Sequence, residues 1–244
     1  MKRLLYKLKR KRYLNSIRKF AAHINPPDIY YIDVGARGNL QEPWKTLHDT
    51  NIVKVVGFEP DRMEFDRLSA TFPNRKYYPY AVGNKNDTNI KLSIAKTESC
   101  SSIHKPNIDY IKQHYLTDNF VPRITSKTID VPSITLSRIP ENLDFIKIDT
   151  QGSEIDILKG SNEILSNCNL LYLETPVIEY NLNSPSLSEC VEYLNSIDFV
   201  PYDICEVHYM DKMLVQIDIL YIRKTKFLEI FPNQQTIDLL KKSN

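Results

Sequence analysis

The chain has 244 residues, of which 42% are hydrophobic and 25% are charged, a balance typical of globular proteins and unlike that of disordered or fibrous chains. No apolar run reaches the ~20 residues that a membrane span requires, and the length suits one α/β domain. The cysteines lie far apart without metal-ligand spacing, so we expect reduced thiols at Cys100, Cys168, Cys190 and Cys205.

The positive charge is concentrated at the N-terminus. Nine of the 32 basic residues precede residue 20 and no acid precedes Asp28, which leaves 23 basic against 30 acidic residues and a net charge near −7 for the rest of the chain. An acidic body argues against a nucleic-acid-binding main domain, because phosphate neutralisation requires positive charge. Residues 1–27 are predicted to form a basic helical arm. Its partner is left open between its own domain, an anionic membrane and a nucleic acid or protein.

The arm has no uninterrupted apolar stretch and no small-residue cleavage site, so we do not interpret it as a secretory signal. We therefore expect a cytoplasmic protein, with contact to the inner face of the membrane through residues 1–20 as an open alternative.

Short apolar runs alternate with helical stretches from residue 28 onward, a pattern typical of a parallel sheet with crossover helices. In chain order we expect a strand at 29–34, a helix at 43–50, a strand at 53–58, a helix at 60–71, strands at 76–82 and 143–149, a helix at 153–159, a strand at 169–174, a helix at 186–196 and strands at 199–207 and 213–224. The predicted domain covers 28–226, with 96–128 as a lid or insertion, and 227–244 as a helical tail.

The chain has only six glycines, and five of them lie at or just after the carboxyl ends of predicted strands: Gly35, Gly38, Gly57, Gly83 and Gly152. In an open α/β sheet, ligands bind at the carboxyl ends of the strands. We therefore expect a ligand site at this edge, although any single glycine can equally be a simple turn residue.

Two acids narrow the choice of ligand. Asp33 closes the first predicted strand, and Glu59 closes the second 26 residues later, a spacing typical of an acid that accepts hydrogen bonds from ribose hydroxyls. The intervening loop, GARGN, lacks the GxGxxG pattern of dinucleotide folds. An acid just before the loop disfavours a pyrophosphate and favours a cationic ligand such as S-adenosylmethionine.

Over residues 28–223 the sequence resembles the FkbM-type methyltransferase family, through the blocks YIDVGARGNLQEPW, VVGFEPD, YPYAVGN, SCSSI and DFIKIDTQGSEIDILKG. The resemblance implies the class I Rossmann-like fold, α/β with a mostly parallel seven-stranded sheet and helices on both faces. It implies S-adenosylmethionine as cofactor and O-methylation of a hydroxyl on a sugar, glycan or small metabolite. The cofactor-binding residues that it implies are Asp33, Gly35, Ala36, Arg37, Gly38, Glu59, Pro60, Ala81, Val82 and Asp149.

Arg37 and Asn39 depart from the common class I loop, where glycines stand. We expect Arg37 to contact the carboxylate of the cofactor or an acidic substrate. Asp149 is the candidate general base, with cofactor positioning or loop capping as its alternative role.

Glu174, His104 and His208 are reserve candidates for the base, and no metal site is predicted. Two other functions stay open: a non-catalytic nucleotide-binding or membrane-associated scaffold that uses the basic arm, and a methyltransferase with RNA as acceptor.

Overall fold

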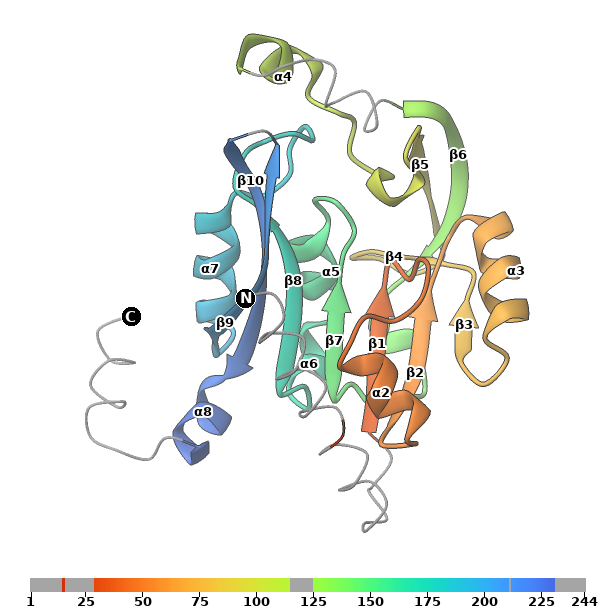
Figure 1. Cartoon of the computed structure of the whole chain (residues 1–244), viewed down its shortest axis with the longest axis vertical. Helices are drawn as coiled ribbons and strands as arrows, with labels where there is room; N and C mark the ends of the chain where they lie inside the picture. Colours follow the sequence, from red (N-terminus) through yellow and green to blue (C-terminus); the bar gives the residue numbers. More distant parts are fainter. Residues whose placement is uncertain (1–14, 16–28, 115–124, 211, 231–244) are drawn as a thin grey trace.

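The computed structural model describes residue 15 and residues 29–114, 125–210 and 212–230 (Figure 1). The predicted helical arm, apart from residue 15, and the predicted tail beyond residue 230 lie outside the described residues, as do residues 115–124. In the part of the chain that is described, no helix is long and apolar enough to cross a membrane.

Seven strands form the main sheet, in the order β3-β2-β1-β7-β8-β10-β9. They are β1 Ile29–Val34, β2 Val53–Phe58, β3 Lys76–Tyr78, β7 Phe145–Ile148, β8 Leu170–Pro176, β9 Phe199–Met210 and β10 Met213–Arg223. Neighbouring strands are parallel except at β10, which is antiparallel to both β8 and β9. The predicted class I sheet, seven-stranded and mostly parallel, is confirmed.

Helices pack on both faces of the main sheet: α2 Trp44–Asp49, α3 Arg62–Thr71, α5 Glu154–Gly160, α6 Asn162–Leu165 and α7 Leu187–Ser196, with α8 Lys224–Ile230 following β10. Successive side chains of a strand point to opposite faces. Ile32 of β1 therefore belongs to one core with α5, α6 and α7. Its neighbour Tyr31 stacks on Trp44 of α2, on the other face.

Two of the predicted helices begin at capping side chains. The Asp61 side chain accepts a hydrogen bond from the backbone of Met63 at the start of α3, and Ser186 forms a capping box with Glu189 at the start of α7. The helices predicted at 43–50, 60–71, 153–159 and 186–196 are α2, α3, α5 and α7, and the two late strands are β9 and β10.

The prediction of one strand over 76–82 is wrong. The strand of the main sheet ends at Tyr78, and Ala81 begins a second sheet of order β4-β6-β5. Its strands are β4 Ala81–Val82, β5 Thr88–Ala95 and β6 Thr125–Ile134. Pro79 stands at the break, and a proline cannot donate a ladder hydrogen bond. Figure 1 shows β5 and β6 above the ends of β1 and β2.

The stretch 96–128, which the sequence predicted as a lid or insertion, begins directly after β5 and ends within β6. A short 3-10 helix, η1 Glu98–Cys100, follows β5, and α4 Ile108–His114 lies further from the main sheet, at the top of Figure 1. Another 3-10 helix, η3 Leu136–Arg138, follows β6. Ser93 and Ser102 exchange two backbone hydrogen bonds, so the chain after η1 is attached to β5.

Candidate active site

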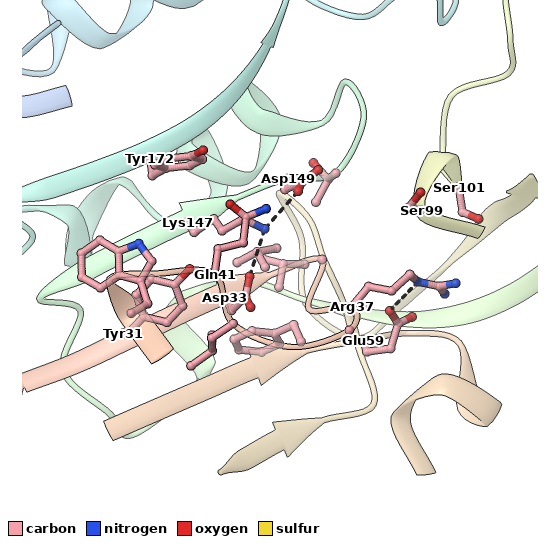
Figure 2. A pocket seen from close by; sticks show the side chains of 18 of the residues that line it. Tyr31, Asp33, Arg37, Gln41, Glu59, Ser99, Ser101, Lys147, Asp149 and Tyr172 are labelled. Atoms are coloured by element: carbon pink, nitrogen blue, oxygen red, sulfur yellow. Dashed lines mark hydrogen bonds and ion pairs between the residues drawn. The ribbon is translucent and has the colours of Figure 1, made fainter. Parts of the chain in front are cut away.

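A cavity of about 1260 Å³ opens at the carboxyl edge of the main sheet, where β1, β2 and β7 end (Figure 2). Its lining continues to Tyr172 of β8 and Glu206 of β9 on one side, and to Ala81 of β4 and Ser99 of η1 on the other. Pockets for one small ligand measure roughly 300–1,000 Å³, so this cavity has room for two ligands side by side.

The first loop of the site lies directly on the end of β7. Gly35 has a φ of +82°, and a Cβ placed on it would stand 2.1 Å from the carbonyl oxygen of Asp149. Conversely, the Asp149 N–H donates to the Val34 carbonyl at 3.1 Å. Only glycine permits this approach, because it has no Cβ and tolerates the left-handed backbone. The loop after β1 and the end of β7 therefore form one rigid floor.

Lys147 joins the two acids of this floor. Its ammonium lies 3.3 Å from an Asp33 carboxylate oxygen and 3.0 Å from one of Asp149 (Figure 2). Burial alone would raise the pKa of Asp149, but the charge and hydrogen bond of Lys147 outweigh burial and hold that pKa at about 2. Asp149 is therefore available as a charged hydrogen-bond acceptor at neutral pH.

Glu59 is the buried acid at the end of β2, with a residue exposure of 4%. One of its oxygens accepts the Asp61 N–H at 2.7 Å, and the other lies 3.4 Å from the Arg37 guanidinium. Burial raises the pKa of Glu59 to about 7, even though the charge of Arg37 opposes the rise. This carboxyl group thus changes its charge close to neutral pH.

Arg37 forms ion pairs with acids of its own chain, and its expected contact with the carboxylate of the cofactor or with an acidic substrate stays a prediction. Besides Glu59, its guanidinium lies 3.8 Å from Asp61 and 3.0 Å from Glu98 of η1. Arg37 thereby connects the first loop to the second sheet, and the structure pairs it with carboxylates of its own chain.

Most of the residues that the sequence assigned to the cofactor come together here. Nine of the ten line the cavity: Asp33, Gly35, Arg37, Gly38, Glu59, Pro60, Ala81, Val82 and Asp149. Ala36 is the exception, because it is buried beneath the loop, where its N–H donates to the Phe58 carbonyl at 2.9 Å.

The reserve candidates for the base lie elsewhere. Glu174 is buried behind the cavity, where it accepts a short hydrogen bond from Gln151, and burial together with the nearby charge of Asp149 raises its pKa well above the ordinary value. His104 lines a separate cavity of about 700 Å³, and its Nδ1 lies 2.9 Å from the Leu182 carbonyl oxygen. None of the three reserve candidates, His208 included, lines the main cavity.

Several lining residues were not identified from the sequence. Tyr31 precedes Asp33 by two positions and shares its face, so strand alternation was a usable signal. Tyr172 is the register partner of Lys147, a relation that requires knowledge of the strand order. Asp203 and Glu206 enter the lining from β9, and Gln41 from the loop before α2.

The lining is strongly acidic. It contains seven carboxylates, on Asp33, Glu42, Glu59, Glu98, Asp149, Asp203 and Glu206, and two cations, Arg37 and Lys147. Both cations pair with carboxylates of the chain. A low-dielectric cavity with this excess of negative charge attracts cationic ligands and repels anionic ones.

Comparisons with known proteins find one matching family and several similar structures. The sequence matches the profile of the methyltransferase FkbM domain over residues 33–201. No curated protein sequence matches the chain. Among solved structures, an FkbM methyltransferase from Methylobacillus flagellatus KT is similar at 18% identity and a TM-score of 0.46, covering 80% of this chain. The matched part is 43% of that protein's chain, so our chain spans less than half of its length.

Two further solved structures are similar to this chain, with comparable TM-scores. Magnesium protoporphyrin IX methyltransferase from Synechocystis PCC 6803, with bound SAM, has 8% identity and a TM-score of 0.46, covering 87% of this chain and 78% of its own. The 1,6-didemethyltoxoflavin-N1-methyltransferase from Burkholderia thailandensis has 10% identity and a TM-score of 0.42, covering 86% of this chain and 77% of its own.

Proposed function

The chain belongs to the FkbM methyltransferase family, and from this premise we propose that it transfers the methyl group of S-adenosylmethionine to a hydroxyl group of a sugar, a glycan or another small metabolite. The observation that carries the proposal is the acidic two-ligand cavity at the carboxyl edge of the sheet, with Glu59 at one end and Asp149 at its centre.

The described residues fit the cofactor that the family implies. The buried Glu59 carboxylate provides acceptors for a ribose diol, and Ala81 and Val82 offer an apolar wall beside it for the adenine. The missing Cβ at Gly35 lets the loop after β1 lie against the end of β7, which brings Asp33 and Asp149 to the same cavity. When bound, S-adenosylmethionine supplies an electrophilic methyl group on a sulfonium, and the acidic lining suits that positive charge.

The remaining lining supports a neutral, hydroxyl-rich acceptor. Tyr31 and Tyr172 present aromatic rings to the cavity, and the side chains of Gln41, Ser99 and Ser101 add hydrogen-bonding groups (Figure 2). Pockets that combine apolar rings with a few polar groups bind small organic ligands and fix their orientation. The excess of carboxylates disfavours phosphorylated acceptors and RNA.

Asp149 is the proton acceptor in this proposal. The acceptor oxygen forms a bond to the methyl carbon, the carbon–sulfur bond breaks with its electrons passing to sulfur, and the hydroxyl proton passes to Asp149. A carboxylate with a pKa of about 2 is a weak base. It suffices here because a hydroxyl oxygen that is taking up a methyl group becomes strongly acidic. Lys147 keeps Asp149 ionised and correctly oriented for this step.

The test is methyl transfer from isotopically labelled S-adenosylmethionine to a panel of acceptors, read by mass spectrometry. The panel pairs neutral sugars and oligosaccharides with their phosphorylated counterparts and includes an RNA oligonucleotide. We expect label on an oxygen of a neutral acceptor. Transfer to RNA alone would favour the RNA alternative, and no transfer to any member would favour the scaffold.

A matched pair of variants tests the role of Asp149. Asp149→Asn should lower kcat by roughly 10²- to 10⁴-fold, the range typical of a positioned proton acceptor, while the affinity for S-adenosylhomocysteine stays close to that of the wild type. Asp156→Asn removes an exposed carboxylate from α5, outside the cavity, and should leave kcat unchanged. Wild-type kcat in Asp149→Asn would exclude it as the proton acceptor.

A further inference from the structure

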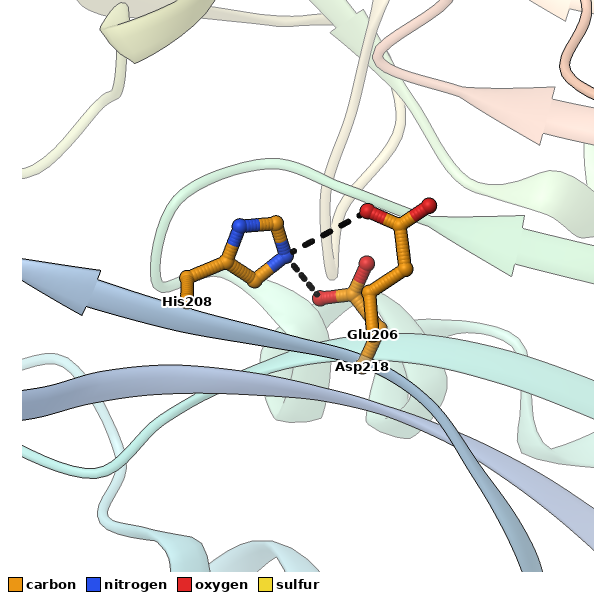
Figure 3. Close-up of side chains that lie close together, drawn as sticks. All are labelled: Glu206, His208 and Asp218. Atoms are coloured by element: carbon orange, nitrogen blue, oxygen red, sulfur yellow. Dashed lines mark ion pairs between the residues drawn. The ribbon is translucent and has the colours of Figure 1, made fainter. Parts of the chain in front are cut away.

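Three side chains from the last two strands of the main sheet converge at the rim of the cavity. Glu206 and His208 lie two positions apart on β9, and Asp218 of β10 is the register partner of Glu206 (Figure 3). One donor atom from each lies within 4.8 Å of the others. The His208 Nε2 is 3.4 Å from an Asp218 oxygen and 3.7 Å from a Glu206 oxygen.

Neighbouring side chains fix the position of Asp218 within this cluster. Asp218 has a residue exposure of 7%, and its Oδ2 accepts a hydrogen bond from the Tyr172 hydroxyl at 2.8 Å. Its Oδ1 faces His208 and also lies 3.4 Å from the Gln216 amide nitrogen. A carboxylate that is fixed through one oxygen and presents the other is the usual arrangement of a metal ligand with an outer partner.

The His208 nitrogen is the second distinguishing feature. Its Nε2 is shielded from solvent and has no hydrogen-bond partner among the residues that the structure describes, although it points between two carboxylates. The ring nitrogen and the two carboxylates therefore face one another without a regular hydrogen bond, although the His208 side chain is 39% exposed, and a cation placed between the three donors would satisfy all of them.

The donor set and its spacing identify the class of cation. Imidazole with two carboxylates suits first-row transition metals, whereas Mg²⁺ and Ca²⁺ prefer oxygen ligands only. Ligands about 2.1 Å from a tetrahedral ion stand about 3.4 Å apart, close to the two separations at His208. Because Glu206 also lines the cavity, an ion held by these three donors would border the space where the acceptor would lie.

We propose that Glu206, His208 and Asp218 bind one divalent transition-metal ion of the Zn²⁺ class, which holds an oxygen of the acceptor. This role rests on the proposed function. Asp149 ends β7, and two strand spacings separate β7 from β10, so the ion would stand about 10 Å from the proton acceptor. At that distance the metal positions a second group of the acceptor and leaves the reacting hydroxyl to Asp149.

The site is tested by calorimetric titration of the chelator-treated full chain with Zn²⁺, Mn²⁺ and Mg²⁺, without methyl donor or acceptor. We expect one Zn²⁺ per chain and much weaker binding of Mg²⁺. His208→Gln and Asp218→Asn should each weaken Zn²⁺ binding by roughly a hundredfold or more, since even outer partners of metal ligands are worth about 10- to 100-fold. Tyr172→Phe, which removes only the outer hydrogen bond, should weaken it by about tenfold.

Two further variants keep the test decisive. Glu206→Gln changes a side chain that is 43% exposed, so it removes a ligand without disturbing the buried Asp218. His104→Gln removes a histidine outside the cluster and should leave binding unchanged. Absence of saturable one-to-one binding in the wild type, or wild-type affinity in both His208→Gln and Glu206→Gln, would overturn the metal site. Methyl transfer by a protein that binds no metal would overturn the site and leave the proposed function standing.

Discussion

The affinity for the methyl donor should depend on pH, because the buried Glu59 changes its charge near neutrality. Its carboxylate accepts hydrogen bonds from the ribose in the proposed complex, and its protonated form has lost acceptor capacity. With a pKa of about 7 in the free protein, the apparent Kd is multiplied by about 11 at pH 6 and by about 1.1 at pH 8. S-adenosylhomocysteine should therefore bind roughly tenfold more tightly at pH 8 than at pH 6.

Isothermal titration calorimetry measures this effect directly. At pH 7, titrations in buffers of different ionisation enthalpy should show release of about half a proton on binding, because half of the Glu59 side chains start protonated. Glu59→Gln should remove the pH dependence and weaken binding at pH 8 by about 1.5–3 kcal/mol, the usual worth of a hydrogen bond to a charged group.

Glu98→Gln is the matched control. Glu98 also pairs with Arg37 at 3.0 Å, but its side chain is 65% exposed and it is not the proposed ribose acceptor. This variant should keep the tenfold pH dependence. The reasoning is refuted if wild-type affinity is flat between pH 6 and 8, or if Glu59→Gln retains the slope.

Three further predictions concern stability and local geometry. Gly35→Ala should abolish donor binding and destabilise the fold in urea denaturation, because its Cβ would meet the Asp149 carbonyl at 2.1 Å. Gly38→Ala is the control, because its Cβ would meet nothing within 4 Å. It should cost only the strain of a positive φ and keep donor binding. Burial raises the pKa of Glu154 from 4.5 to about 7, so the folded chain holds a proton that the unfolded chain releases. The free energy of unfolding should therefore fall by up to about 3 kcal/mol from pH 4.5 to pH 7 through this group, and Glu154→Gln should remove that part of the decline in parallel denaturation curves. Ser186→Ala should lower the unfolding free energy by about 1 kcal/mol through loss of the α7 cap, and an unchanged midpoint would contradict that role.

The sequence predicted those parts of the site that depend on local pattern. Asp33 and Glu59 follow apolar strands, and the glycine at position 35 marks a close backbone approach, so each could be located without knowing the strand order. The main sheet followed from the same runs of apolar residues. Ala81 and Val82 were assigned to the site through the family resemblance, although the strand that carries them was placed in the wrong sheet.

The remainder depends on pairing between strands that are distant in sequence. Tyr172 faces the cavity because β8 lies beside β7, and the cluster of Glu206, His208 and Asp218 exists because β9 and β10 pair antiparallel in one particular register. A shift by one residue would turn every side chain to the other face, so sequence spacing alone cannot place these groups together. The second sheet was missed for a related reason, since several residues of β5 and β6 are exposed and give no continuous apolar run.

The three-stranded sheet beside the site has a kinetic consequence. Its strand β4 brings Ala81 and Val82, against which we propose that the adenine lies, to the cavity, and η1, which follows β5, brings Ser99 to the same side. Strands β4, β5 and β6 share one small apolar core that includes Ala81, Leu92 and Val131, and the chain after η1 is attached to β5 through Ser93 and Ser102. In the proposed complex, a donor seated against β4 would therefore contact the same small sheet to which η1 is attached. Such an architecture favours ordered addition, in which the donor enters first and the acceptor completes the ternary complex.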